Sequence, residues 1–177
     1  MFAVAAVGVV IASRNTHRGG TAFAVNVGDQ APEFQLRATN GETVSLGRLR
    51  QRGKVLLFFY EGIMCQPCWD QLRAIQQDYA QFRDLGIDVV GITVDPFEHL
   101  VAKVGQDGIV LPVLVDEDAR VSRLYDTLRI GSMHPGQRPG HTFILVGRDG
   151  VVLWRQDYSE MFVPDAILLR QLRAIRG

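Results

Sequence analysis

Two cysteines are the residues of this sequence best suited to chemistry. Cys65 and Cys68 are the only cysteines among 177 residues, and two residues separate them. They stand between an apolar run, Lys54–Tyr60, and a segment whose apolar residues recur at helical spacing. Two thiols at this spacing between a strand and a helix are typical of thiol–disulfide exchange. We therefore expect the chemistry of the protein to be located here.

The two flanking elements predict how the cysteines are presented. The run Lys54–Tyr60 is continuous, β-branched and aromatic, which is typical of a strand buried on both faces of a largely parallel sheet. Apolar residues then follow at intervals of four and three, which predicts one helix that ends near Gly86. These apolar positions are Cys68, Leu72, Ile75, Tyr79 and Phe82. The stripe places Cys68 on the buried face and leaves Cys65 exposed before the first turn, where Pro67 is well tolerated.

These positions give the two sulfurs different roles. A thiolate at a helix N-terminus is stabilised by unpaired backbone N–H groups and by the positive end of the helix dipole. We expect Cys65 to attack a partner disulfide and Cys68 to resolve the mixed disulfide. The redox-active Cys65–Cys68 bridge then serves as the reactive group, and no separate cofactor is expected.

The cysteine pair has two other interpretations. Half of a zinc site would need two further ligands at metal-binding spacing, and the sequence holds no third cysteine. A purely structural disulfide would close a very short loop, which restricts the unfolded chain only slightly. The order of strand, cysteine pair and helix favours the redox interpretation over both.

The composition is that of an ordinary soluble domain. Hydrophobic residues make up 47% of the chain and charged residues 21%, which is enough for one well-filled core. Nineteen basic and nineteen acidic residues give a formal net charge of zero. No broad electrostatic field favours nucleic acid, so we expect no nucleic-acid partner.

The N-terminal segment differs from the remainder. Residues 2–12 are apolar, but they are fewer than the roughly 20 needed to span a bilayer as a helix. One interpretation is a loose tail; the other, which we prefer, is the end of a membrane anchor whose beginning is missing from this chain. We divide the chain into this segment with its linker, residues 1–26, and a folded domain, residues 27–177. An anchored or secreted domain would lie outside the cytoplasm; without an anchor it would be cytoplasmic.

Strands and helices are predicted to alternate through the folded domain. Asn40 and Gly41 mark a hairpin, and residues 46–51 a short helical turn. Further strands are expected at residues 87–94, 111–115, 142–146 and 151–154, the last two as an antiparallel hairpin. Helices are expected from Pro96, after Asp118 as a cap, and from Pro164, with a loop from Ile130 to Gly140. This alternation predicts a three-layer α/β/α sandwich with a mixed central sheet.

From about Val27 to Ile175 the chain resembles the thioredoxin-like redoxin family, which includes the alkyl hydroperoxide reductase/thiol-specific antioxidant (AhpC/TSA) proteins and peroxiredoxins. The motifs that carry the resemblance are Gly28-Asp29-Gln30-Ala31-Pro32-Glu33-Phe34, Cys65-Gln66-Pro67-Cys68, Ile92-Thr93-Val94-Asp95, Leu114-Val115-Asp116 and Thr142-Phe143. The resemblance implies a thioredoxin-like fold and thiol-based redox chemistry with a protein disulfide or dithiol as partner.

The sequence departs from both branches of that family. Peroxiredoxins carry Pro-x-x-x-Thr-x-x-Cys, and Glu61, Cys65 and Cys68 stand at those three positions. Their peroxide-polarising arginine would fall on Gly140, although Arg138 is near. Thioredoxin-like reductases place a cis-proline opposite the cysteines; the same count gives Gly140, and Pro139 is one residue early. We assign Pro67, Pro139 and Gly140 to contact with the substrate.

Three functions follow in order of preference. The first is a thiol–disulfide oxidoreductase, in which Glu61 takes the proton of Cys68 unless it is an ordinary exposed carboxylate. The second is a thiol-dependent peroxidase, in which one cysteine forms a sulfenic acid with a hydroperoxide and condenses with the other. The third is a copper-binding or metallochaperone role. Its candidate soft ligands, besides the two thiolates, are Met64, Met133, His134 and His141.

Overall fold

A seven-stranded mixed sheet forms the centre of the computed structural model, which describes residues 25–129 and 131–175. The strands are β1 (Gln35–Ala38), β2 (Thr43–Ser45), β3 (Lys54–Phe59), β4 (Ile87–Thr93), β5 (Val113–Val115), β6 (His141–Val146) and β7 (Val152–Tyr158). The helices are α1 (Leu46–Arg50), α2 (Gln66–Gln77), α3 (Tyr79–Asp84), α4 (Phe97–Gln106), α5 (Arg120–Leu124) and α6 (Asp165–Arg173). The expected hairpin at Asn40-Gly41, between β1 and β2, is present.

The sheet order is β2-β1-β5-β4-β3-β6-β7. Strands β3, β4 and β5 run parallel at its centre, and the other neighbours pair antiparallel. Phe59 of β3 pairs with Ile92 of β4, so both strands end at the same edge of the sheet. Residues that follow β3 and β4 therefore meet there, as is usual for ligand and catalytic groups on open α/β sheets.

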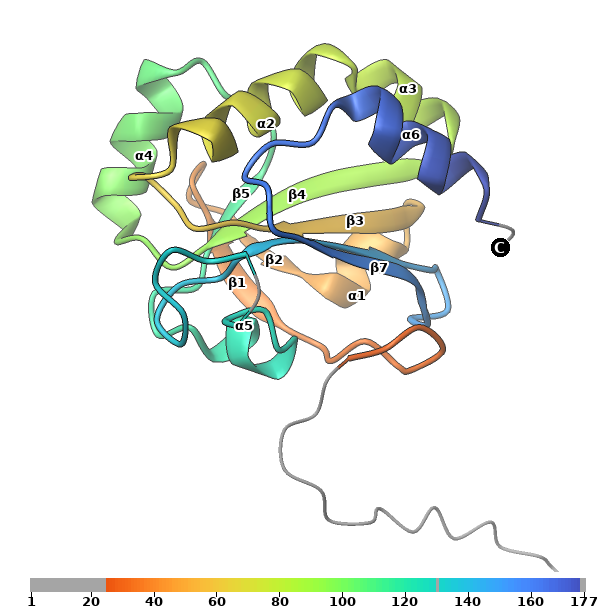
Figure 1. The fold of residues 1–177 in the computed structure, drawn as a ribbon. Coiled ribbons are helices and arrows are strands. Elements are labelled where there is room, and N and C mark those ends of the chain that lie inside the picture. Colours follow the sequence, from red (N-terminus) through yellow and green to blue (C-terminus); the bar gives the residue numbers. More distant parts are fainter. Residues whose placement is uncertain (1–24, 130, 176–177) are drawn as a thin grey trace, which may run out of the picture.

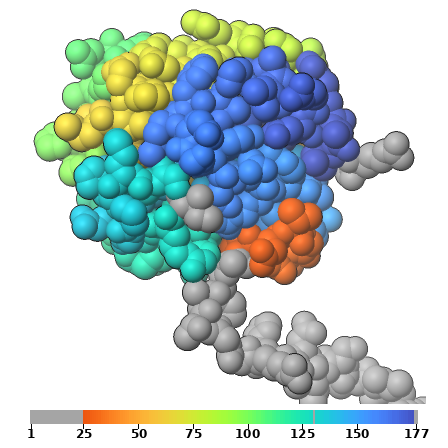
Figure 2. All heavy atoms as spheres, viewed as in Figure 1, coloured from red at the N-terminus to blue at the C-terminus, as the bar shows by residue number. Residues whose placement is uncertain are grey.

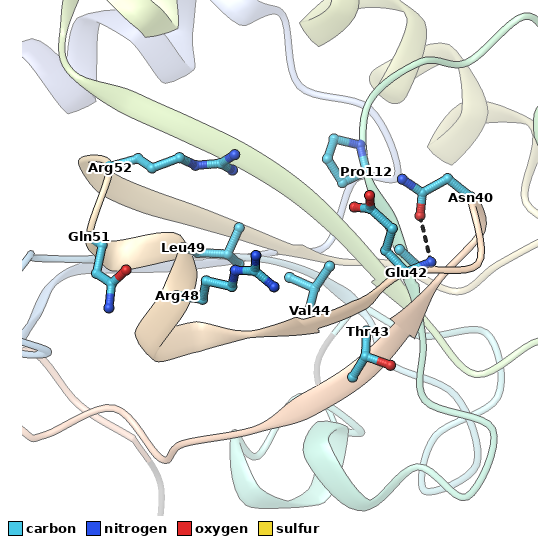
Figure 3. Close-up of a pocket in the computed structure, with 10 residues that line it drawn as sticks. Asn40, Glu42, Thr43, Val44, Arg48, Leu49, Gln51, Arg52 and Pro112 are labelled. Atoms are coloured by element: carbon cyan, nitrogen blue, oxygen red, sulfur yellow. Dashed lines mark hydrogen bonds between the residues drawn. The ribbon is translucent and has the colours of Figure 1, made fainter.

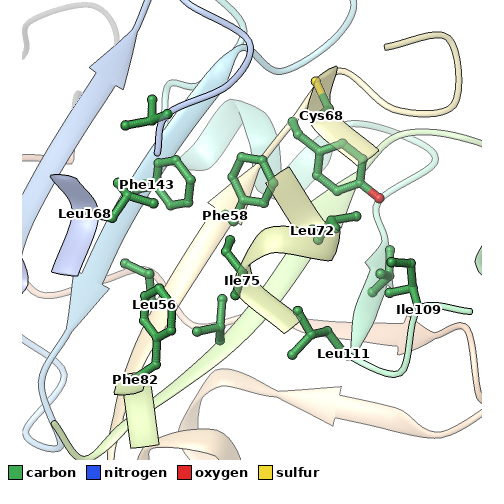
Figure 4. Close-up of a cluster of buried hydrophobic side chains, with 14 of the residues drawn as sticks. Leu56, Phe58, Cys68, Leu72, Ile75, Phe82, Ile109, Leu111, Phe143 and Leu168 are labelled. Carbon is green, nitrogen blue, oxygen red and sulfur yellow. The ribbon is translucent and has the colours of Figure 1, made fainter. Parts of the chain in front are cut away.

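Helices cover both faces of this sheet, as the three-layer prediction requires. Helices α2, α3, α4 and α6 lie on one face, and α1 and α5 on the other (Figure 1). Strand β3 supplies alternate side chains to two cores, Leu56 and Phe58 to the first and Leu57 and Phe59 to the second. The first core also holds both cysteines, and Figure 4 shows Cys68 of α2 among its residues. The predicted mixed α/β sandwich is confirmed.

The segment after the cysteines is two helices, where the apolar spacing predicted one. Helix α2 ends at Gln77, and Asp78, with φ −94° and ψ 12°, leaves the helical conformation before α3 begins. The bend lets the Tyr79 hydroxyl donate to Asp88 Oδ1 at 3.1 Å, on strand β4. The stripe of apolar residues continues across the break, and for that reason the sequence pattern did not reveal it.

Helix α5 is capped by a different aspartate from the one expected. The Asp118 carboxylate accepts only the Arg120 N–H, at 3.0 Å. The buried Asp116 carboxylate accepts the Val121 N–H at 3.0 Å and both the N–H and the hydroxyl of Ser122 at 2.7 Å. Asp116 directly follows the parallel strand β5, and it therefore joins the end of that strand to the start of α5.

The apolar N-terminal stretch at residues 2–12 lies outside the described residues, so the division at residue 26 stays a prediction. Within residues 25–129 and 131–175, no helix has the length and apolar character needed to cross a membrane. The first described residue, Val25, is buried in the second core, and its carbonyl accepts from Arg155 Nη1 at 3.0 Å.

Candidate active site at the cysteine pair

Cys65 and Cys68 form a disulfide at the point where β3 gives way to α2. Cys65 is the N-cap residue of α2, and its sulfur accepts the Cys68 N–H at 3.3 Å. Pro67 lies in the first turn of the helix and is exposed, as predicted. The sulfur of Cys65 thus accepts an N–H group of the first helical turn, which also donates to the Cys65 carbonyl at 3.1 Å. A sulfur at the N-terminus of a helix is in the arrangement that stabilises a thiolate.

The expectation that Cys65 is the exposed sulfur is wrong for this disulfide-bonded state. Cys65 is 1% exposed and Cys68 is 0% exposed. The reason is the bond itself, because it ties Cys65 to a residue on the inner face of the helix. The neighbour Met64, at 78% exposure, occupies the surface instead.

The turn before Cys65 is held from two sides. The Gly62 carbonyl accepts the Cys65 N–H at 3.1 Å and the indole N–H of the buried Trp69 at 3.2 Å. The Asp95 carboxylate, which follows β4, accepts the Ile63 N–H at 2.8 Å. Trp69 is therefore a packed residue that fixes the turn, rather than part of the surface seen by a partner.

Glu61 is buried beneath this turn, which excludes the interpretation of an ordinary exposed carboxylate. It is 1% exposed, and its Oε1 lies 2.7 Å from His134 Nδ1 and 3.4 Å from the Ser132 hydroxyl. Among residues 25–129 and 131–175, its buried Oε2 has no hydrogen-bond partner. A buried carboxylate with a free oxygen is suited to take a proton.

Arg138 connects the loop before β6 to both strand ends. Its Nη1 donates to the Glu61 carbonyl and to Asp95 Oδ1, each at 2.8 Å. The ion pair with Asp95 is largely shielded from solvent, since the Arg138 side chain is 26% exposed and that of Asp95 4%. The loop that the sequence marked as irregular is thus tied to the cysteine turn through Glu61 and Asp95.

Pro139 and Gly140 follow Arg138 directly and are both buried. Gly140 N–H donates to the Thr127 carbonyl at 2.8 Å. The described residues contain no cis peptide bond, so Pro139 does not take the cis form found in thioredoxin-like reductases. The assignment of Pro67, Pro139 and Gly140 to substrate contact stays a prediction.

A second polar chain, which was not predicted from the sequence, runs under the middle of α2. Gln71 Nε2 donates to Asp165 Oδ1 at 2.8 Å, and Gln71 Oε1 accepts the Val163 N–H at 2.7 Å. His141 Nε2 lies 3.3 Å from the same Gln71 oxygen. Because that oxygen is an acceptor, Nε2 must carry the proton, and His141 Nδ1 is left buried without a partner.

Burial sets the titration of this second chain. It lowers the pKa of His141 to about 3 and so keeps the ring neutral. Burial also raises the pKa of Asp165 to about 7, with a further contribution from the charge of Asp78, while the hydrogen bond from Gln71 opposes the rise. The His141 ring is thus neutral in the physiological range, and Asp165 keeps its proton to higher pH than an ordinary carboxyl group.

The candidate copper ligands do not gather at the cysteines. His141 packs against the rings of Phe58 and Phe143, and His134 contacts Glu61. Across residues 25–129 and 131–175, no group of three or more His, Cys, Asp and Glu side chains is arranged to hold a metal ion. The protein side chains therefore give the copper interpretation no support.

A groove of about 660 Å³ lies away from the cysteines (Figure 3). It is formed by the β1–β2 hairpin and α1, with Arg48, Arg52 and Glu42 among its charged residues. None of the groups that surround the disulfide lines it, so it does not enter the chemistry proposed below.

Comparison with known proteins identifies the family. Residues 27–155 match the AhpC/TSA family. The chain belongs to this family. Similar proteins include the thiol-disulfide oxidoreductases ResA of Bacillus subtilis, 30% identical over 103 residues, and of Oceanobacillus iheyensis, 32% identical over 112 residues. These matches cover 58% and 60% of this chain and 56% of each relative, so they span little more than half the length of those proteins.

Peroxiredoxins are also among the AhpC/TSA relatives. The putative peroxiredoxin Rv2521 of Mycobacterium tuberculosis is 34% identical over 94 residues, which is 53% of this chain and 59% of that protein. The crystal structure of peroxidoxin BcpB from M. tuberculosis superimposes with a TM-score of 0.74 at 25% identity, over 85% of this chain and 98% of that one. A PrxQ mutant of Xylella fastidiosa gives 0.76 at 16% identity, over 86% and 98% of the two chains. These superpositions confirm the thioredoxin-like fold.

The cysteine pair and Glu61 were predictable from the sequence, but the contacts of the groups around them were not. Asp95 and Arg138 hold the turn, whereas the sequence placed Asp95 only in a family motif and Arg138 only near the position of the peroxiredoxin arginine. His134 was expected only as a copper ligand. One signal for Asp95 was present: it follows a buried strand parallel to β3, and the ends of such strands meet at one edge. The contacts of His134 and Arg138 depend on the path of an irregular loop, which no periodicity encodes.

Proposed function

We propose that this AhpC/TSA protein is a thiol–disulfide oxidoreductase whose reactive group is the Cys65–Cys68 pair. The observation that carries the proposal is the position of Cys65, an N-cap residue whose sulfur accepts a helix N–H and is bonded to the inner cysteine. The ResA relatives carry the name of the same activity. A protein disulfide or dithiol is the proposed partner.

The reaction proceeds through one mixed disulfide. In the reduced protein the Cys65 thiolate attacks one sulfur of the partner disulfide; a Cys65–partner bond forms, the partner S–S bond breaks, and a partner thiolate leaves. Cys68 then loses its proton and attacks the Cys65 sulfur, which releases the second partner thiolate. Two electrons pass to the partner, and the Cys65–Cys68 disulfide is restored. The reverse sequence oxidises a partner dithiol.

Glu61 is proposed to accept the proton of Cys68 in the resolving step. It lies two residues beyond the end of β3, is as buried as the disulfide, and holds one oxygen without a hydrogen-bond partner among the described residues. Pro67 on the exposed first turn, with Pro139 and Gly140 in the loop beside Glu61, is proposed to contact the substrate backbone. The link from Arg138 to the Glu61 carbonyl supports this placement, because Arg138 immediately precedes Pro139.

Single-cysteine variants test the assignment of roles. Cys68→Ser is expected to accumulate a mixed disulfide through Cys65, because no thiol remains to resolve it, whereas Cys65→Ser should trap at least tenfold less. The measurement is non-reducing electrophoresis with mass spectrometry after incubation with an oxidised protein. Trapping by Cys65→Ser instead would show that the nucleophile is wrongly assigned.

A second candidate, a thiol-dependent peroxidase, is favoured by one observation. Arg138 reaches the end of β3 and donates to the Glu61 carbonyl, so a cation lies near the place where peroxiredoxins hold an arginine. Its guanidinium is also paired with Asp95, and the motif threonine and proline are replaced by Cys65 and Glu61. Hydrogen peroxide decay and disulfide reduction measured on one sample separate the two. Rapid peroxide turnover without disulfide exchange would overturn the first proposal.

A location outside the cytoplasm is proposed together with this activity. An exported or membrane-anchored domain outside the cytoplasm suits the apolar residues 2–12 and a redox-active disulfide. Fractionation of cells that express the full chain, followed by immunodetection, tests this location. Recovery of the protein only in the cytosolic fraction would contradict it.

A further inference from the structure

The Glu61 carboxylate reaches solvent through one side chain. Glu61 is 1% exposed, whereas the His134 side chain, 2.7 Å away at Nδ1, is 53% exposed. The chain segment of residues 131–140 lies directly beside the start of α2 on the molecular surface (Figure 2). His134 therefore has one edge of its ring against a buried carboxylate and the remainder in water.

The other charged groups at this place are already engaged. Arg138 donates to the backbone carbonyl of Glu61 and to the carboxylate of Asp95. These hydrogen bonds do not involve the Glu61 carboxylate. The Ser132 hydroxyl lies farther from Glu61 Oε1, at 3.4 Å, and its oxygen also accepts the backbone N–H of His134 at 3.0 Å. Ser132 thus orients His134, and the described residues offer no other titratable side chain in contact with the carboxylate.

An imidazole in this position can pass protons as well as hold the loop. It takes a proton on one ring nitrogen and releases one from the other. Glu61 has its two oxygens in different settings: Oε1 faces His134, while Oε2 is buried and free. A proton that enters the carboxyl group at Oε2 can reach His134 if the group rotates by half a turn and presents its O–H to Nδ1.

We propose that His134 is a positioning and proton-relay residue for the redox site, which carries the proton of Cys68 from Glu61 to water. The inference rests on the proposed function and deepens it. In the resolving step the Cys68 proton moves to Glu61 Oε2, and the Cys68 thiolate attacks the Cys65 sulfur. The Glu61 carboxyl group then rotates so that its O–H faces His134 and transfers the proton to Nδ1 of the ring that carries its own proton on Nε2. Glu61 is a carboxylate again, Nε2 releases its proton to solvent, and tautomer exchange through water returns the ring to its starting form. No electrons move in the relay.

The attack of Cys65 and the attack of Cys68 can be measured separately with an aromatic disulfide that releases a coloured thiolate at each step. With reduced protein and excess dithiobis(nitrobenzoate), the first nitrothiobenzoate is released when Cys65 attacks, and the second when Cys68 closes the bridge. The leaving thiolate needs no proton, so the second phase reports the deprotonation and attack of Cys68. Stopped-flow absorbance at several pH values gives both rates for the wild type and each variant.

The relay predicts a selective effect on the second phase. His134→Gln keeps a hydrogen-bond donor near Glu61 but cannot relay, so the second phase should slow roughly ten- to a hundredfold while the first stays within about twofold. The second phase of the variant should also depend more steeply on pH than that of the wild type, because hydroxide must replace the lost relay. His99→Gln, on the exposed face of α4, is the matched control and should behave as wild type.

Chemical rescue distinguishes a relay from a structural role. Added imidazole should restore much of the second phase in His134→Gly and leave the wild type unchanged, since the lost group is replaced in solution. In the background of Glu61→Gln, replacement of His134 should have no further effect on the second phase, because the relay begins at that carboxylate. Circular dichroism verifies that each variant is folded, and the Gln variant alone decides the question if the Gly variant is not.

These experiments distinguish a failure of the oxidoreductase proposal from a failure of the proton relay. If the wild type releases only one coloured thiolate per protein, the proposed disulfide chemistry itself fails. If the wild type releases two and His134→Gln keeps the wild-type second rate and pH profile, the oxidoreductase proposal stands and the relay is overturned. A slowed second phase that imidazole does not restore in a folded Gly variant would also overturn it.

Discussion

Gly62 is the residue on which the geometry of the cysteine turn depends most directly. Its φ is +111°, and a Cβ built there would lie 1.9 Å from Asp95 Oδ2. The same residue accepts from Cys65 N–H and from the Trp69 indole through its carbonyl. Both the backbone conformation and the space therefore require glycine.

Gly62→Ala is expected to destabilise the protein by about 2–4 kcal/mol, since it combines a strained φ with displacement of the Asp95 carboxylate. Disulfide closure should slow as well, because the Ile63 N–H loses its acceptor. Urea unfolding under non-reducing conditions measures the first effect. Gly105→Ala in α4, where a Cβ meets nothing within 4 Å, is the matched control and should be neutral or slightly stabilising. Equal effects of the two substitutions would contradict this account.

Individual residues also show where sequence reasoning stops. The apolar stripe correctly placed Cys68 inside, but it could not place Cys65, whose burial comes from the disulfide that joins the two. Glu61 follows the strand predicted at Lys54–Tyr60, and from that position alone its side chain could be either exposed or buried. Its burial depends on His134 and Ser132, which are more than 70 residues later in the chain and join it only through the tertiary fold.

Among the elements, α2, β6 and α6 are joined by the chain of His141, Gln71 and Asp165. The pKa of Asp165 is raised from 3.8 to about 7, so the stability it contributes is complete below about pH 4 and is lost as the pH rises toward 7. The pKa of His141 is lowered from 6.5 to about 3, so its contribution is complete above about pH 6.5 and is lost as the pH falls. Between these limits the two slopes oppose each other.

Asp165→Asn should expose the pH dependence of stability that His141 contributes. Without the buried carboxyl, the free energy of unfolding should fall more steeply from pH 6.5 to pH 4 than in the wild type, by up to roughly 1.4 kcal/mol for each pH unit. His141→Gln should do the reverse and leave a protein that loses stability as the pH rises. Denaturant unfolding at a series of pH values measures both. Parallel pH curves for the wild type and Asp165→Asn would show that the carboxyl is not proton-linked to folding.

The elements were largely predictable because their periodicity is strong. The continuous apolar runs of β3 and β4 and the hairpin at Asn40-Gly41 appear where the sequence placed them. The break at Asp78 and the cap from Asp116 were missed for a shared reason: each depends on a contact between elements, with Asp88 on β4 in one case and with the end of β5 in the other.

For the molecule as a whole, the central strand makes the two cores one cooperative unit. Leu57 belongs to the second core, whereas Trp69 lies in the first and Trp154 packs against it. Leu57→Ala should therefore lower the stability seen by tryptophan fluorescence by about 2–4 kcal/mol, although its side chain lies on the other face of the sheet. Hydrogen exchange at α1 and α5 should report the same loss. Separate transitions for the two faces would contradict a single unit.

At this scale the fold was the most predictable feature, and the surroundings of the disulfide the least. Alternating strands and helices determine the layers, and the AhpC/TSA family match agrees with them. The site depends instead on residues from β3, the end of β4 and the loop before β6, which meet only when the sheet has formed.

The last helix also bears on how the protein can be handled in the laboratory. Asp165 at the start of α6 bonds to Gln71, one turn beyond the inner cysteine, and Leu168 packs in the same core as the disulfide. An affinity tag or truncation that loosens the C-terminal helix would thus uncover the underside of the redox helix. Activity lost in such a preparation would report damage to this support rather than the intrinsic reactivity of the sulfurs.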